Sequence, residues 1–176
     1  MNKLELRMYG FVPYNISPIQ QGIQFGHAVV EYSQRMKYLG EHNQQLNIQY
    51  NDWADNWKTF IILNGGTTNN KTVDGKYLGT LNQHQETLTN IGVFNVCFNE
   101  PDLGDQLTAV VFIVDERIFN KEKYPQFQFK IKNQQDLNNP YFVDENEKQD
   151  WTMWVQSIGG WKNLQLRNFL QNFRLA

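Results

Sequence analysis

The chain has 176 residues, of which 40% are hydrophobic and 19% are charged, and its formal net charge is −2 at pH 7. This length suffices for one ordinary domain, whose core needs neither a disulfide nor a metal ion for stability. The single cysteine, Cys97, excludes an internal disulfide, and no Cys/His cluster has zinc spacing, so we expect no metal and no cofactor. Tight binding of long nucleic acids usually requires a basic domain, so the near-zero charge argues against it. The charge is compatible with binding of small nucleotide ligands.

The sequence has no feature of a membrane protein. Its longest apolar runs, such as residues 108–114, are much shorter than the roughly 18 residues that a membrane span requires, and residues 1–7 do not resemble a signal peptide. We therefore expect a cytoplasmic protein that does not bind membranes. Asn and Gln together account for 39 residues, a bias typical of AT-rich genomes such as those of some phages, in which case the cytoplasm would be that of the host cell.

A strand and a helix are predicted at the start of the chain. Residues 4–12 mix alternation with a short apolar run that ends at a proline, which predicts a first strand. Ser17 is then a good N-cap, Pro18 suits the first helical position, and Gln20 completes a capping box. The helix that begins here should continue to about Tyr38.

This helix carries apolar residues and glycines at helical spacing. Ile19, Ile23 and Val30 lie on or near one face. Gly22 and Gly26 are four residues apart, and we expect them to let the helix backbone approach a sheet closely, because glycine inside a helix costs stability and needs a packing reason.

The following segments alternate between strand and helix patterns. A short turn or helical piece is expected at residues 52–57, and a helix at residues 81–90. Strands are expected at residues 58–63, 93–98 and 107–114. Residues 67–80 should form an exposed loop with a turn at Asp74-Gly75. The order β-α-β-α-β-β predicts an α/β fold with a small mixed four-stranded sheet and helices on its faces. Crossovers make parallel neighbours, and the last two strands can be antiparallel.

The composition changes after this α/β core, which we place at residues 1–116. We expect residues 117–176 to form an extension, with a strand at residues 126–132 and a helical tail from residue 144 that Gly159-Gly160 interrupts. The apolar face of the tail would pack on the core or form a contact between copies of the chain. The second arrangement would make the protein a homo-oligomer.

Two places in the chain could carry chemistry. His27 lies in the first helix, close to Gln24 at i,i+3 spacing, and is either functional or an ordinary helix histidine. Glu100 and Asp102 directly follow a strand and so lie at the rim of the sheet, where α/β proteins place ligands, or else form a solvated turn.

Other features give weaker signals. Cys97 lies within an apolar strand and is typical of a buried small hydrophobic residue. His42 and His84 lack ligand spacing, so we expect them at the surface. Gly65-Gly66 could cradle a phosphate, but no lysine follows at the P-loop distance, which favours a turn.

Residues 17–32 resemble the first helix of the family 2 peptidyl-tRNA hydrolases, the archaeal and eukaryotic type, which carries a Gln-x-x-His-Ala signature. Gln24, His27 and Ala28 match this signature. The resemblance covers about residues 4–116 and implies the fold of that family for this part of the chain.

The same resemblance assigns further positions and shows departures. It places Glu100 where the family has an Asp, and Thr108 where the last strand begins with a Thr. The catalytic lysine of the family falls at Gln20, and the acidic corner reads Glu-Pro-Asp-Leu where the family has Asp-Ala-Gly-x-Thr. The end of the chain resembles uncharacterised phage-encoded relatives.

The first functional hypothesis is an active peptidyl-tRNA hydrolase that cleaves the peptide–tRNA ester. The resemblance then implies His27 as general base or water-positioning group, Glu100 or Asp102 as its orienting carboxylate, and Thr108 as a hydrogen-bond donor. The absent lysine removes the obvious stabiliser of the oxyanion, which is worth about 3–4 kcal/mol.

The second hypothesis, which we favour, is a catalytically degenerate fold that binds a nucleotide or a tRNA 3′ end. A phage could use it as a sponge that sequesters a nucleotide immune signal, such as a cyclic nucleotide or an ADP-ribose derivative. A helix N-terminus would face the phosphate. The expected ligand-binding residues are Ser17, Gln20, Gln21, Gln24, His27, Glu100, Asp102 and Thr108. The candidate stacking aromatics are Tyr14, Phe25, Trp53 and Trp57.

Overall fold

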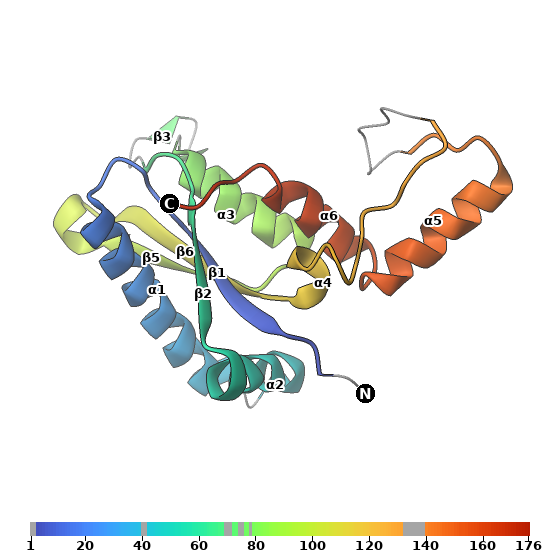
Figure 1. Ribbon diagram of the computed structural model, residues 1–176. Coiled ribbons are helices and arrows are strands. Elements are labelled where there is room, and N and C mark those ends of the chain that lie inside the picture. The colour runs from blue at the N-terminus through green and yellow to red at the C-terminus, as the bar shows by residue number, and fades with distance from the viewer. Residues whose placement is uncertain (1–2, 40–41, 69–71, 74–75, 78, 132–139) are drawn as a thin grey trace. The chain divides into compact units, whose positions relative to one another are not determined.

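The computed structural model describes residues 3–39, 42–68, 72–73, 76–77, 79–131 and 140–176 (Figure 1). The chain divides into two compact units. The first consists of Lys3–Val114 together with Phe173–Ala176, and the second of Asp115–Asn172. None of the helices within the described ranges has the length and apolarity that crossing a bilayer requires.

A four-stranded mixed sheet forms the centre of the first unit. Its strands are β1 (Leu6–Val12), β2 (Thr59–Asn64), β5 (Asn95–Glu100) and β6 (Gln106–Asp115), in the spatial order β2-β1-β6-β5. Strands β1 and β2 are parallel, whereas β5 and β6 are antiparallel. The α/β class, the mixed four-stranded sheet and the order of the core elements are therefore confirmed.

The helices of the first unit are α1 (Pro18–Leu39), α2 (Gln44–Asp52) and α3 (Thr80–Ile91), and a π-helical turn (Trp53–Trp57) follows α2. Helix α2 was not predicted, because its amide-rich sequence has no fully buried residue and packs on the core only through Leu46 and Tyr50. A short antiparallel hairpin, β3 (Thr72–Val73) and β4 (Lys76–Tyr77), occupies part of the predicted loop. The turn expected at Asp74-Gly75 lies outside the described residues.

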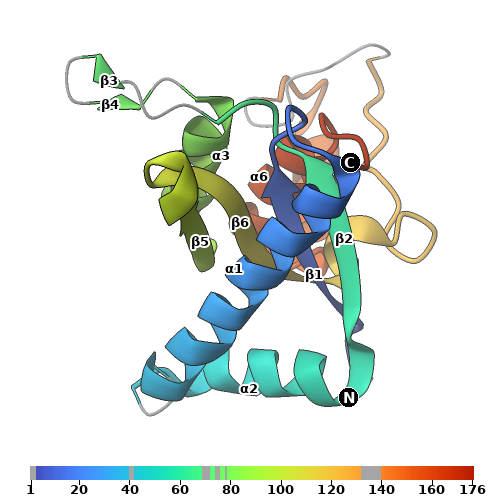
Figure 2. The same cartoon turned by 90° about the vertical axis from the view of Figure 1, so that its left-hand side faces the viewer.

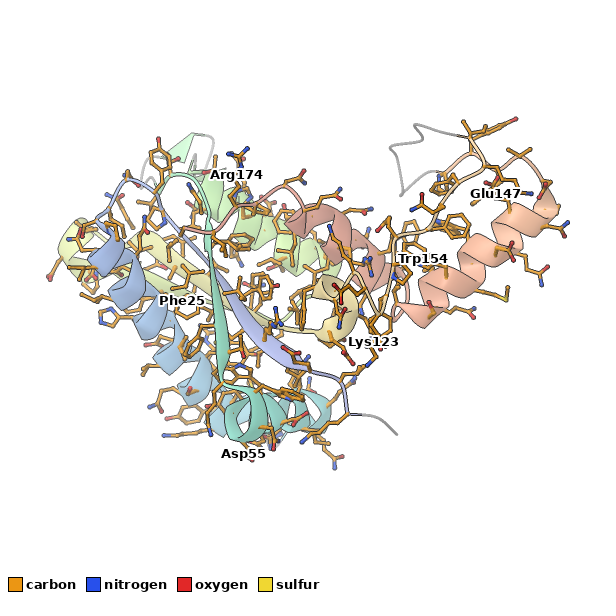
Figure 3. All side chains as sticks on the ribbon, in the orientation of Figure 1. Phe25, Asp55, Lys123, Glu147, Trp154 and Arg174 are labelled. Carbon is orange, nitrogen blue, oxygen red and sulfur yellow. The ribbon has the colours of Figure 1, made fainter. Side chains whose placement is uncertain are left out.

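Helix α1 packs on one face of the sheet, and Figure 2 shows it crossing the strands. Met8 and Val12 of β1 contribute to the core on this side, together with Phe25 and Tyr32 of α1. Gly10 lies between them in β1, and a Cβ atom at this position would collide with the ring of Phe25, which Figure 3 labels. The absence of a side chain at Gly10 therefore lets α1 lie close to the sheet.

The start of α1 is as predicted, but its orientation is not. The N–H of Ser17 donates to Oε1 of Gln20 at 3.1 Å, and the N–H of Gln20 donates to Oγ of Ser17 at 3.3 Å, which completes the capping box. Gly22 and Gly26 have nothing within 4 Å of an added Cβ, so the expected close approach at these glycines is wrong.

The apolar set chosen from the sequence points to solvent. Ile19, Ile23 and Val30 have exposed fractions of 78%, 49% and 57%. The buried face of α1 consists instead of Gln24, Phe25, Ala28, Tyr32 and Met36. Aromatic, small and sulfur-containing side chains at helical spacing, together with one amide, therefore face the sheet, whereas the aliphatic set does not.

The opposite face of the sheet carries a second aromatic layer. Phe11 of β1 packs against His84 of α3, with 5.4 Å between the ring centroids, and against Phe173 at 4.5 Å. His84 was expected at the surface, but it is half-buried here. Burial lowers the pKa of His84, because desolvation disfavours the charged imidazolium.

The last residues of the chain cover the free edge of β2. The N–H of Asn64 donates to the carbonyl of Arg174 at 3.0 Å, and the N–H of Ala176 donates to the carbonyl of Ile62 at 3.0 Å. These bonds satisfy backbone groups that an edge strand would otherwise leave open to pairing with other chains.

The second unit contains α4 (Glu116–Phe119), α5 (Glu145–Ser157) and α6 (Trp161–Leu170). Asp144 caps α5, and Gly159 and Gly160, with φ of 97° and 89°, separate α5 from α6 as predicted. The core of this unit is formed by Val155, Ile158 and Leu164 with Tyr124, Trp151 and Trp154 packed against it.

The strand predicted at residues 126–132 is wrong for residues 126–131, which the structure describes as irregular. The alternating Phe127 and Phe129 pack on each other, with ring centroids 4.9 Å apart. The backbone N–H of Lys130 donates to Oε1 of the buried Glu147 at 2.6 Å, so this N–H bonds to a carboxylate and not to a neighbouring strand. Figure 3 labels Glu147.

Candidate functional site

Gln24 connects α1 to the β5–β6 hairpin through two short hydrogen bonds. Its Nε2 donates to Oε2 of Glu100 at 2.6 Å, and Oγ1 of Thr108 donates to its Oε1 at 2.6 Å. The side chain of Gln24 is 7% exposed and Thr108 is fully buried. Three of the expected binding residues, far apart in the sequence, thus form one hydrogen-bonded chain, which we call the Thr108–Gln24–Glu100 chain.

A β-bulge gives Thr108 its place in this chain. Ala109 pairs with Phe98 and Leu107 pairs with Asn99, so Thr108 is the additional residue on β6. Bulges redirect a side chain relative to the regular alternation of a strand. The hydroxyl of Thr108 thereby reaches the amide of Gln24, and it lies 3.3 Å from the carbonyl of Phe98.

The acidic corner separates its two candidate carboxylates. Glu100 ends β5 and is half-buried, whereas Asp102 is exposed in a 3₁₀ turn at Pro101–Leu103. The N–H of Asp105 donates to the carbonyl of Glu100 at 3.0 Å, which closes the turn. Asp102 therefore fits the solvated-turn interpretation, and Glu100 belongs to the hydrogen-bonded chain.

His27 lies exposed one helical turn after Gln24. Its ring packs against Phe98, with 4.6 Å between the ring centroids. Within the described residues, no hydrogen bond joins His27 to Glu100 or Asp102, so its orientation by a carboxylate stays a prediction. Phe98 was missed by the sequence reasoning, although its position two residues before Glu100 on a strand favours a shared face.

The amides at the N-terminus of α1 serve the backbone. The carboxamide oxygen of Gln20 bonds to Ser17 in the capping box, and both residues are exposed. Nε2 of Gln21 donates to the carbonyl of Pro13 at 3.1 Å. Gln20 and Gln21 thus hold the connection between β1 and α1 in place.

The four aromatic candidates differ in burial. Phe25 and Trp53 are core residues, with 4% and 5% exposure, and the half-buried Trp57 packs against the same core. Tyr14 is 59% exposed, so its ring is open to a ligand.

Two of the weaker candidates behave as ordinary structural residues. Burial raises the pKa of Cys97 to about 11, so its thiol stays protonated near neutral pH and is a poor nucleophile. At the glycine turn, the N–H of Gly66 donates to Oδ1 of Asn64 at 2.9 Å and the N–H of Thr67 donates to Oγ1 of Thr80 at 2.7 Å. These N–H groups bond to side chains of the protein, and the backbone of residues 65–68 is irregular.

His42 is exposed, as expected. In the part of the chain that the structure describes, no three His, Cys, Asp or Glu side chains gather closely enough to hold a metal ion.

Comparison with protein-family models, with curated proteins and with solved structures found no match to this chain. The resemblance to peptidyl-tRNA hydrolases therefore rests on the sequence motifs alone.

Proposed function

We propose that this protein binds a nucleotide beside the Thr108–Gln24–Glu100 chain and releases it unchanged. The observation that carries the proposal is the buried amide of Gln24, bonded at both ends, next to the exposed ring of His27. Ligand sites commonly combine a few oriented polar groups with aromatic surface, and the pair His27–Phe98 supplies the latter.

The contacts around Glu100 and Gln20 favour binding over hydrolysis. Glu100 accepts a hydrogen bond from Gln24 and none from His27, and His27 contacts an apolar ring. At Gln20, where the resemblance implies a lysine, the side chain is neutral and caps its own helix. The loss of one oxyanion donor costs about 10²–10³-fold in rate, so a site without this cation is suited to retention of its ligand.

In this proposal the protein is a phage-type sponge for a nucleotide signal, on a fold like that of the peptidyl-tRNA hydrolases. A cyclic nucleotide and an ADP-ribose derivative are both candidate ligands. Such a function requires slow release and abundance, and needs no proton transfer.

The alternative is an active peptidyl-tRNA hydrolase. It is favoured by the exposure of His27, because a general base must reach water or substrate. In this case His27, Glu100 and Thr108 would be the catalytic residues.

One pair of assays separates the two functions. The full chain is titrated by calorimetry with ADP, ADP-ribose and cyclic dinucleotides, and each bound nucleotide is recovered and analysed for chemical change. Peptidyl-tRNA is incubated with the wild type, with His27→Ala and with His42→Ala, which replaces an exposed histidine outside the site. Binding of an unchanged nucleotide without peptidyl-tRNA turnover supports the proposal. Multiple turnovers that His27→Ala abolishes and His42→Ala preserves would establish the hydrolase.

A further inference from the structure

The hydrogen bonds of the site have one direction, and this direction indicates which part of a nucleotide it can hold. A carboxylate only accepts hydrogen bonds, so the amide of Gln24 must turn its NH₂ group toward Glu100. Its oxygen then faces Thr108, whose hydroxyl must be the donor. The chain thus runs from the Thr108 hydroxyl through Gln24 to an acceptor, Glu100.

Glu100 has capacity for a ligand. Its Oε2 atom accepts from Gln24, and no described residue donates to its Oε1 atom. The residue is half-buried at the end of β5, where the 3₁₀ turn begins. The group that the site offers is therefore a negatively charged acceptor. Such a group repels phosphate and attracts neighbouring hydroxyl donors.

We infer that Glu100 receives the 2′,3′-diol of a ribose, so that the phosphates of the ligand point away from it. This inference rests on the proposed function. A carboxylate that accepts ribose hydroxyls is a recurrent solution in nucleotide sites. The adjacent His27–Phe98 pair offers a ring surface for the sugar or the base. The ligand class is then a nucleotide with a free diol, such as an ADP-ribose derivative, and excludes 3′,5′-cyclic dinucleotides, whose 3′ oxygens are esterified.

Thr108 and Gln24 are positioning residues in this arrangement. The bulge at Thr108 directs its hydroxyl to Gln24, and this bond fixes the amide that holds Glu100. Thr108→Val keeps the shape but removes the donor, whereas Thr108→Ser keeps the donor. The selectivity for a diol should therefore survive in Thr108→Ser and be lost in Thr108→Val.

The test compares ADP with 2′,3′-dideoxy-ADP, which differ in the diol alone. For the full-length wild type we expect ADP to bind at least about tenfold more tightly, since a lost hydrogen bond to a charged group is worth about 1.5–3 kcal/mol. Glu100→Gln should lose most of this preference, because its outer amide group no longer offers a charged acceptor. Asp105→Asn, which changes an exposed carboxylate in the same turn, should keep the wild-type preference.

The outcomes distinguish this inference from the proposed function. Equal affinity of the wild type for ADP and its dideoxy analogue overturns the diol inference and leaves nucleotide binding intact. A preference that persists in Glu100→Gln overturns the assignment to Glu100. Thr108→Val is compared with the wild type by circular dichroism to verify its fold. If this folded variant still prefers ADP over the dideoxy analogue, the positioning role of Thr108 is overturned. Failure of ADP, ADP-ribose and the cyclic dinucleotides to bind overturns the proposed function and the inference together.

Discussion

At the scale of single residues, Gln24 shows how a polar group becomes part of a core. The neighbouring positions on the buried face of α1 include Phe25 and Ala28. An amide in such surroundings is destabilising unless both of its ends are bonded, and Thr108 and Glu100 provide these partners. The same bonds that make Gln24 tolerable in the core fix the orientation of the site.

Replacement of this amide should therefore be costly. Gln24→Leu keeps the approximate volume but removes the donor to Glu100 and leaves the hydroxyl of Thr108 only the carbonyl of Phe98, 3.3 Å away, so we expect the free energy of unfolding to fall by about 1–3 kcal/mol. The measurement is urea denaturation. Gln34→Leu, the same change at an exposed position of α1, is the control and should stay within about 0.5 kcal/mol of the wild type. Equal effects of the two variants would contradict the role of the buried bonds.

His84 should make stability depend on pH. Burial lowers its pKa in the folded state, so the unfolded chain, with a histidine pKa of about 6.5, takes up the proton first. The contribution of His84 is complete above about pH 6.5 and is lost as the pH falls through the lower folded-state pKa. The free energy of unfolding is measured by urea denaturation at about pH 7.5 and about pH 5.5. The decrease between these two pH values should be smaller for His84→Phe than for the wild type. For His42→Phe, at an exposed site, the free energy of unfolding should decrease by as much as for the wild type.

At the scale of elements, the signals that succeeded are local ones. The capping box at Ser17 and the interruption at Gly159-Gly160, with φ of 97° and 89°, marked helix ends correctly because such signals depend on neighbouring residues. The orientation of α1 and the irregular state of residues 126–131 depend on partners distant in the sequence, which periodicity does not contain. The same limit applies to the site, where the Thr108 bulge appears only once β5 and β6 are paired.

Two glycines of α1 with open space beside them give a prediction at this scale. Gly22 and Gly26 have open space where a Cβ would lie, so alanine adds helix propensity without a clash. We expect Gly22→Ala and Gly26→Ala each to raise the free energy of unfolding, by up to about 1 kcal/mol, in thermal or urea denaturation. Gly10→Ala is the contrasting variant and should destabilise the protein, because its Cβ would collide with Phe25. Destabilisation by the two helix variants would contradict the open space at Gly22 and Gly26.

At the scale of the whole molecule, the two compact units do not follow each other along the sequence, because the first unit contains two separate stretches of the chain. Residues 115–172 form the second unit, yet the four residues that follow belong to the first. Phe173 joins the aromatic layer with Phe11 and His84. The expected boundary at residues 116 and 117 assigned the entire end of the chain to the extension, since nothing in its sequence distinguishes the last residues from the helix before them.

This return of the chain predicts an effect of a very short truncation. Removal of residues 174–176 deletes the backbone partners of Asn64 and Ile62 while it keeps the aromatic layer intact. Two lost hydrogen bonds should lower the free energy of unfolding by about 1–3 kcal/mol, and the amide of Asn64 should exchange faster with solvent. The open edge of β2 should also raise concentration-dependent association, which sedimentation would detect. Leu175→Ala is the matched control, because it trims a 72% exposed side chain and keeps the backbone. If this control were as unstable as the truncation, side-chain packing rather than edge pairing would explain the effect.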